Sequence, residues 1–189
     1  YALMGMESIG FGKWSDANAL AAEIGAPNAP YPDADLVITA PGEESGTYDS
    51  FVEFAIADIA EERGQDDALR PDYVASPNDN VIIEGVSGTP TSLGFVGYSF
   101  YLANQGRVMA LEIDGGAGCV APSAQTIADG TYPYSRLLYI YVNKASALRP
   151  EVAAYVDLYL SEQGLSVVDR TGYIRLADYS ATLEAWQNR

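Results

Sequence analysis

Ser45, Gly46 and Thr47 form a polar turn of a kind that can bind an anion. The turn precedes an amphipathic stretch, and the first N–H groups of a helix have no partner inside it. The helix dipole adds roughly half a positive charge at the same end. Gly46 allows the backbone to approach a ligand and the two hydroxyl groups add donors, so the turn suits a tetrahedral oxyanion. A serine at this place is also a favoured helix cap, which needs no ligand.

The elements on either side of the turn are predicted from their hydrophobic pattern. Residues 36–39 are apolar and β-branched, which indicates a buried strand. Apolar residues recur at three- and four-residue spacing over residues 46–63, with acidic residues among them, which indicates an amphipathic helix. The turn is therefore expected to join the end of a strand to the start of a helix. The turn is not a Walker A loop, because the sequence contains no Gly-Lys-Ser/Thr.

Strands and helices alternate along the rest of the chain, which predicts the α/β class. Residues 137–142 carry the strongest strand signal. Gly94 and Gly97 interrupt the apolar run at residues 93–98, which predicts a strand with close backbone contacts. Pro150 suits the first turn of a helix, and Gly164 suits its end. The further expected elements are strands at residues 93–98 and 108–113, a strand or amphipathic stretch beginning at residues 81–83, and helices at residues 17–24, 150–163 and 178–187.

The composition excludes several classes of function. The net charge is -16 at pH 7, whereas a protein that binds nucleic-acid phosphates or an anionic membrane surface needs the opposite sign. No histidine is present, so a Ser-His-Asp triad and a histidine-containing zinc site are impossible. Cys119 is the only cysteine, so the chain cannot form an internal disulfide. No apolar run approaches the roughly 20 residues of a membrane-spanning helix, so no membrane insertion is expected.

The region around the turn resembles the signature of a known family. Residues 41–51 read Pro-Gly-Glu-Glu-Ser-Gly-Thr-Tyr-Asp-Ser-Phe. This run is similar to the Gly-Pro-Gly-x-x-Ser-Gly-Thr-Phe-Asp-x-Phe signature of PstS-type phosphate-binding proteins, in the branch with the SphX-like members. Further segments match the family in the same order, and together they cover nearly the whole chain. They are residues 13–16, 70–73 with 76–80, 85–88, 93–98, 121–123 and 129–136.

The resemblance implies a type II periplasmic-binding-protein-like fold, with two lobes of mixed sheets flanked by helices. Residues 1–125 are expected to form the second lobe, and residues 126–189 to return to the first. The fold is expected to be incomplete, because the family's other phosphate loop, a Gly-Ser-Ser/Thr-Thr-type turn near the start of the first lobe, is absent from the sequence.

The implied function is that of a periplasmic or extracellular protein associated with the cell envelope. Such a protein captures inorganic phosphate and delivers it to an ABC permease, without catalysis, cofactor or metal. A binder of a related oxyanion, such as sulfate or molybdate, is an alternative. A phosphate-ester hydrolase with Ser45 as nucleophile is a weaker one, because the chain lacks a histidine base.

The resemblance implies that Ser45, Gly46 and Thr47 bind phosphate. In some relatives an arginine stands four residues before the serine, where this chain has Pro41. Arg70 is the candidate replacement, because a guanidinium can give a phosphate two parallel hydrogen bonds.

Each candidate beyond the turn has an alternative role. For Arg70 the alternative is a surface ion pair with Asp67 or Asp72. Arg136 is a second candidate ligand or a hinge arginine bonded to carboxylates or backbone. Asp49 could accept a hydrogen bond from a protonated phosphate, hold an arginine, or interact with the helix dipole.

Overall fold

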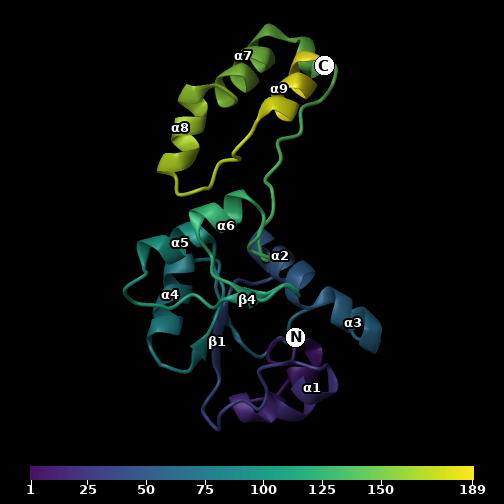
Figure 1. Cartoon of the computed structure of the whole chain (residues 1–189), viewed down its shortest axis with the longest axis vertical. Coiled ribbons are helices and arrows are strands. Elements are labelled where there is room, and N and C mark those ends of the chain that lie inside the picture. Colours follow the sequence, from purple (N-terminus) through teal and green to yellow (C-terminus); the bar gives the residue numbers. More distant parts are fainter. The chain divides into compact units, whose positions relative to one another are not determined.

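The computed structural model describes all 189 residues and divides the chain into two compact units, Tyr1–Met109 and Ala110–Arg189 (Figure 1). Strands and helices occur in both, which confirms the α/β class. The assignment of residues 1–125 and 126–189 to two lobes stays a prediction. The first unit contains the 3-10 helices η1 (Met6–Ser8) and η2 (Trp14–Ala17), then α1 (Asn18–Glu23), β1 (Val37–Ala40), α2 (Gly46–Ala55), α3 (Ala57–Arg63), β2 (Val74–Ala75), α4 (Asp79–Ser87), β3 (Ser92–Leu93) and α5 (Tyr98–Ala103). The second contains β4 (Ile113–Asp114), β5 (Cys119–Val120), α6 (Ala124–Ala128), η3 (Ser146–Leu148), α7 (Pro150–Tyr159), α8 (Glu162–Arg170) and α9 (Ser180–Gln187).

A three-stranded parallel sheet forms the centre of the first unit. β1 lies between the other two strands, in the order β2-β1-β3. Thr39 lies opposite Val74, and Ile38 lies opposite Leu93. Because the three strands are parallel, their carboxyl ends meet at one edge. The strand predicted at residues 36–39 is confirmed, displaced by one residue.

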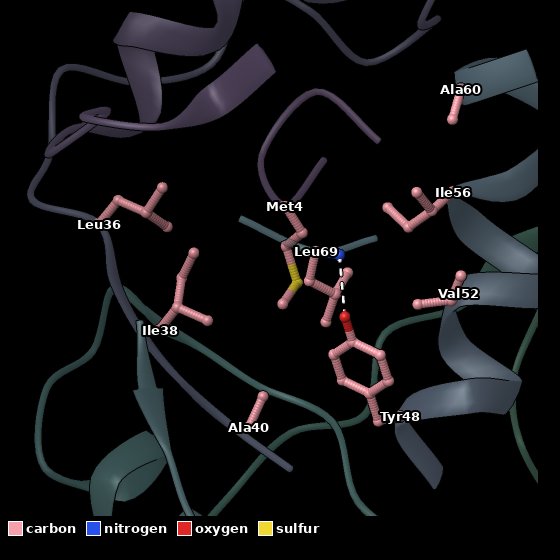
Figure 2. Close-up of a cluster of buried hydrophobic side chains, with 9 residues drawn as sticks. All are labelled: Met4, Leu36, Ile38, Ala40, Tyr48, Val52, Ile56, Ala60 and Leu69. Atoms are coloured by element: carbon pink, nitrogen blue, oxygen red, sulfur yellow. Dashed lines mark hydrogen bonds between the residues drawn. The ribbon is translucent and has the colours of Figure 1, made fainter. Parts of the chain in front are cut away.

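One face of β1 packs against α2 and α3 (Figure 2). Successive side chains of an extended chain point to opposite faces, and Leu36, Ile38 and Ala40 share the face that meets α2 and α3. Residues at four-residue spacing on the two helices form the facing apolar stripe. The stripe consists of Tyr48, Val52, Ile56 and Ala60. Met4 and Leu69 lie between the two sets of side chains, and this cluster is the main core of the unit.

The opposite face of β1 is covered by α4, which approaches closely at the buried Thr39. A Cβ atom at Gly85 would lie 2.4 Å from Thr39 Oγ1. A Cβ atom at Gly94, directly after β3, would lie 2.2 Å from the Thr39 carbonyl oxygen. Neither position has room for a side chain, so two glycines allow this packing. Of the close backbone contacts predicted for residues 93–98, the one at Gly94 is confirmed, whereas a Cβ atom at Gly97 would be no closer than 3.9 Å to its neighbour Phe100.

Two predicted long helices are each divided in two. The helix expected over residues 46–63 is α2 followed by α3, because Ile56 leaves helical geometry at φ -122° and ψ -51°. Ile56 is 1% exposed, so the bend keeps it within the core. The helix expected over residues 150–163 is α7 followed by α8, and Gly164 lies inside α8 rather than at an end. A Cβ atom at Gly164 would lie 2.3 Å from the Leu158 carbonyl oxygen, so the glycine allows α8 to start close to the end of α7.

None of the helices has the length and apolar character needed to cross a bilayer.

The strand predicted at residues 137–142 is wrong, although its sequence signal is the strongest. A strand needs a hydrogen-bonded neighbour, and these residues pair with no strand in the structure. Five of the six side chains are between 48% and 93% exposed. The other predicted strands are shorter than expected. Only Leu93 of residues 93–98 and Ile113 of residues 108–113 belong to strands, and residues 81–83 are helical in α4.

Replacing Gly94 by alanine is expected to lower the free energy of unfolding by about 1–3 kcal/mol, because the new methyl group would overlap the Thr39 carbonyl oxygen. Chemical denaturation followed by circular dichroism measures this change. Gly106→Ala is the matched control, since a Cβ atom there meets nothing within 4 Å. Equal stability of the two variants would contradict the close approach of Gly94 to the backbone of β1.

Candidate anion-binding site

The carboxyl edge of the parallel sheet contains a topological switch point between β1 and β3, because the strand order is β2-β1-β3. β1 is followed by α2, which packs on the face that carries Ile38 and Ala40. β2 is followed by α4, which packs on the opposite face at Thr39. The chain therefore leaves two neighbouring strands toward opposite faces. Open α/β sheets bind ligands outside the carboxyl ends of the strands at such a point.

The Ser-Gly-Thr turn lies at this switch point, between β1 and α2. The Ser45 N–H donates to the Gly42 carbonyl at 3.0 Å, and α2 begins at Gly46. Ser45 is the N-cap of α2, and its Oγ accepts a hydrogen bond from the Thr47 N–H at 3.1 Å. The capping role is therefore present. It is compatible with anion binding, because a hydroxyl that accepts a hydrogen bond retains its own proton for donation.

A second helix begins at the same edge, after β2. The Ser76 N–H donates to the Ala40 carbonyl at 3.0 Å, which joins the ends of β1 and β2. Asn78 caps α4, with its Oδ1 accepting from the Asn80 N–H at 3.0 Å. The amino termini of α2 and α4 both meet this edge, and each adds a partial positive charge there. An anion is the ligand that such an edge favours.

Arg70 lies on the amino side of β2 and is 3% exposed, so it is not the surface residue expected as the alternative. Its Nε and Nη2 donate to the two carboxylate oxygens of Asp72 at 2.6 and 2.7 Å, and Nη2 also donates to the Phe11 carbonyl at 3.0 Å. The Gly10 N–H donates to the same carboxylate at 2.8 Å. Nη1 is buried without a hydrogen-bond partner. Arg70 thus pairs with Asp72 and joins two segments of backbone, and its binding of phosphate stays a prediction.

Asp49 and Arg136 also stay predicted ligands. Asp49 is exposed in the first turn of α2, where a carboxylate interacts favourably with the helix dipole. Arg136 is exposed and belongs to the second unit. Of the predicted residues, the structure brings Asp49 and the Ser-Gly-Thr turn together on one helix terminus.

Two tyrosines beside the turn were not predicted from the sequence. Tyr73 Oη donates to the Pro41 carbonyl at 2.6 Å. Tyr48 Oη accepts from the Leu69 N–H at 3.2 Å, the contact drawn as a dashed line in Figure 2. The chain has 14 tyrosines, and no pattern in the sequence distinguishes these two from the others.

The fold and the turn match a known family. Residues 9–163 match the family model of the PBP superfamily domain. The chain belongs to the PBP superfamily. The crystal structure of a possible phosphate binding protein from Planctomyces limnophilus matches 98% of this PBP chain, with a TM-score of 0.71 and 30% identity. The resemblance proposed from the sequence is confirmed. PstS from Borrelia burgdorferi shares the fold, with a TM-score of 0.53 at 19% identity.

The curated relatives of this PBP chain are longer than the chain itself. Protein SphX of Synechococcus elongatus is 38% identical over 136 residues, which are 71% of this chain and 38% of SphX. Phosphate-binding protein PstS of Pseudomonas aeruginosa is 36% identical over 134 residues, which are 70% of this chain and 39% of PstS. The chain also covers 60% of the Planctomyces limnophilus structure. It therefore spans less than half the length of these two curated relatives.

Asp72→Asn is expected to lower the free energy of unfolding at pH 7 by roughly 1–3 kcal/mol, because it weakens the carboxylate partner of the buried Arg70. The Arg70 guanidinium lowers the pKa of Asp72 to about 2. This contribution is therefore present above the usual carboxyl pKa and is lost as the pH falls from about 4 through 2. Urea denaturation at several pH values measures both effects.

The control for this prediction is Asp67→Asn, which removes an exposed carboxylate nearby. It should leave the stability at pH 7 and the loss of stability below pH 4 close to those of the unsubstituted protein. The same acid dependence in Asp72→Asn and the unsubstituted protein would show that the ion pair does not contribute.

Proposed function

We propose that the chain is part of an extracytoplasmic solute-binding protein that captures inorganic phosphate and delivers it to an ABC permease. The observation that carries the proposal is the Ser-Gly-Thr turn at the amino terminus of the ten-residue helix α2, at the switch point of the sheet. The relatives named as phosphate-binding proteins support the same ligand. Periplasmic or extracellular location is part of the proposal, because the transport step begins outside the cytoplasm.

The donors that the turn itself offers to the ligand are neutral groups. Backbone N–H groups at a helix terminus and the hydroxyls of Ser45 and Thr47 can hold a desolvated oxyanion. The net charge of -16 does not prevent this, because salt screens distant charges over ~8 Å at physiological ionic strength. No arginine stands four residues before Ser45, so the turn depends on its backbone geometry.

Phosphate fits the turn better than sulfate does. Glu43 and Glu44 are exposed directly before Ser45, and both act electrostatically on the nearby Tyr73 hydroxyl. Hydrogen phosphate carries a proton that it can donate to a carboxylate, whereas sulfate is fully ionised at neutral pH. Carboxylates beside the turn therefore repel sulfate more strongly than a protonated phosphate.

Binding without turnover is the proposed activity. A serine nucleophile needs a base within hydrogen-bond reach. The only lysines are Lys13 and Lys144, of which Lys13 is paired with Asp33 at 2.7 Å and Lys144 lies in the second unit. The Ser45 hydroxyl interacts with the Thr47 N–H, which is a capping contact rather than an activating one. The structure holds no group of three or more acidic, histidine or cysteine side chains arranged to bind a metal ion.

Titration of the chain with phosphate, followed by NMR, is expected to shift the Gly46 and Thr47 amide signals. A parallel sulfate titration should shift them less. Ser45→Ala is expected to weaken phosphate binding roughly 2- to 12-fold, because one hydrogen bond contributes about 0.5–1.5 kcal/mol. Stronger shifts with sulfate than with phosphate would contradict the proposed ligand.

Ser161→Ala is the matched control for the loss of a helix cap. Ser161 caps α8 in the second unit as Ser45 caps α2, with its Oγ accepting from the Gly164 N–H at 3.2 Å. Both variants lose a cap of about 1 kcal/mol, so only Ser45→Ala should change phosphate affinity. An equal loss of phosphate affinity in both variants would show that the effect comes from lower protein stability alone.

A further inference from the structure

A short segment before β2 holds the Ser-Gly-Thr turn at both of its ends. This brace segment, residues 69–73, has the sequence Leu-Arg-Pro-Asp-Tyr. At one end, Tyr73 Oη donates to the carbonyl of Pro41, the first residue after β1. At the other end, the Leu69 N–H donates to Oη of Tyr48, which lies in the first turn of α2 (Figure 2). The chain between these two attachment points is residues 42–47, which end in the Ser-Gly-Thr turn.

The Tyr73 hydroxyl is a donor at every pH near neutrality. Its ring is half-buried against the main core cluster, beside Tyr48. Burial, with the charges of the nearby Glu44 and Glu43 adding to it, raises the pKa of Tyr73 to about 12. The hydroxyl therefore remains protonated, and the 2.6 Å contact to the Pro41 carbonyl persists. Pro41 itself is buried, so its carbonyl has little access to water as a replacement donor.

The brace segment is itself rigidly attached. The Arg70 N–H donates to the Met4 carbonyl at 2.9 Å, and the buried Arg70 side chain pairs with Asp72. The Asp72 carboxylate also accepts from the Gly10 N–H at 2.8 Å. A hydrogen bond to a fixed segment restrains its partner more than one to a mobile loop. The Arg70–Asp72 pair thus acts on the turn indirectly, through the backbone of residues 69–73.

Residues 41–45, which lead from β1 into the Ser-Gly-Thr turn, need such restraint, because few other hydrogen bonds hold their backbone. Within residues 41–45 the backbone bond is the one from the Ser45 N–H to the Gly42 carbonyl, at 3.0 Å. Gly42 is buried under the Glu44 side chain, and a Cβ atom there would lie 2.5 Å from Glu44 Oε2. An anion held by neutral donors binds most tightly when the donors are already in place, since ordering them during binding costs free energy.

We propose that Tyr73 is a positioning residue that holds the Ser-Gly-Thr turn in its anion-binding geometry through the Pro41 carbonyl, and that Tyr48 secures the other end. This role rests on the proposed function for its effect on phosphate affinity, but its effect on the backbone of the turn does not. Tyr73 acts through Pro41, and the Tyr73→Phe variant keeps the ring that packs on the core.

The test compares amide hydrogen exchange by NMR in the unsubstituted chain and Tyr73→Phe without phosphate. Exchange of the Ser45 and Thr47 amides is expected to become about tenfold faster, because the local opening of the turn loses a restraint. Exchange of the Ile82 amide in α4 should stay within twofold. Phosphate titration of the same samples is then expected to give about tenfold weaker binding. Tyr31→Phe is the matched control, since the Tyr31 ring packs in a separate cluster near Leu20.

The outcomes are distinguishable. Unchanged Ser45 and Thr47 exchange in Tyr73→Phe would overturn the positioning role, and so would faster exchange of Ile82 by the same factor, since that would indicate general destabilisation. Faster exchange confined to the turn supports the role, and a matching loss of phosphate affinity supports its link to binding. If the unsubstituted chain shows no phosphate shift while the turn exchange rises as expected, the proposed function fails and the brace role stands.

Discussion

The close approach of α4 to β1 at Thr39 determines where the other elements of the first unit can lie. Gly85 and Gly94 leave space for this approach, and the chain after β2 consequently returns across the opposite face from α2 and α3. The two helices that follow neighbouring strands then start at one edge and diverge. The geometry of the proposed anion site is a consequence of this divergence, because it places two helix amino termini at the carboxyl ends of β1 and β2.

The charged side chains near the Ser-Gly-Thr turn make contacts of different kinds. Arg70 pairs with the Asp72 carboxylate and donates to the Phe11 carbonyl, and its binding of phosphate stays a prediction. Neutral donors remain at the turn itself, and glutamates stand before it. A site of this type attracts an anion through fixed dipoles rather than through a cation, so its affinity depends on how well the backbone is held.

The sequence predicted the elements whose signals are local. The apolar, β-branched run at β1, the apolar stripe of α2 and the Ser45 cap need only neighbouring residues, and the structure has all three. The bends at Ile56 and before Gly164 depend on packing between helices. The spacing of apolar residues along the sequence does not reveal such packing. The contact of Tyr73 with Pro41 joins residues far apart in sequence, and the burial of Arg70 depends on packing, so no spacing rule identifies either. The pairing of Arg70 with Asp72 is local, and it is one of the alternatives that the sequence offers. Residues 137–142 show the reverse case, in which a strong local preference lacks a strand to pair with.

That unpaired run also affects how the chain behaves in concentrated solution. Six consecutive residues without charge, proline or glycine, with high β-propensity and largely exposed, have the composition of segments that assemble into cross-β aggregates. Arg136 stands directly before the run and Lys144 lies two residues after it. Cations at the borders of such a segment oppose stacking of identical copies, because each added copy brings like charges together. The overall negative charge adds a second, longer-range repulsion that weakens as salt is added.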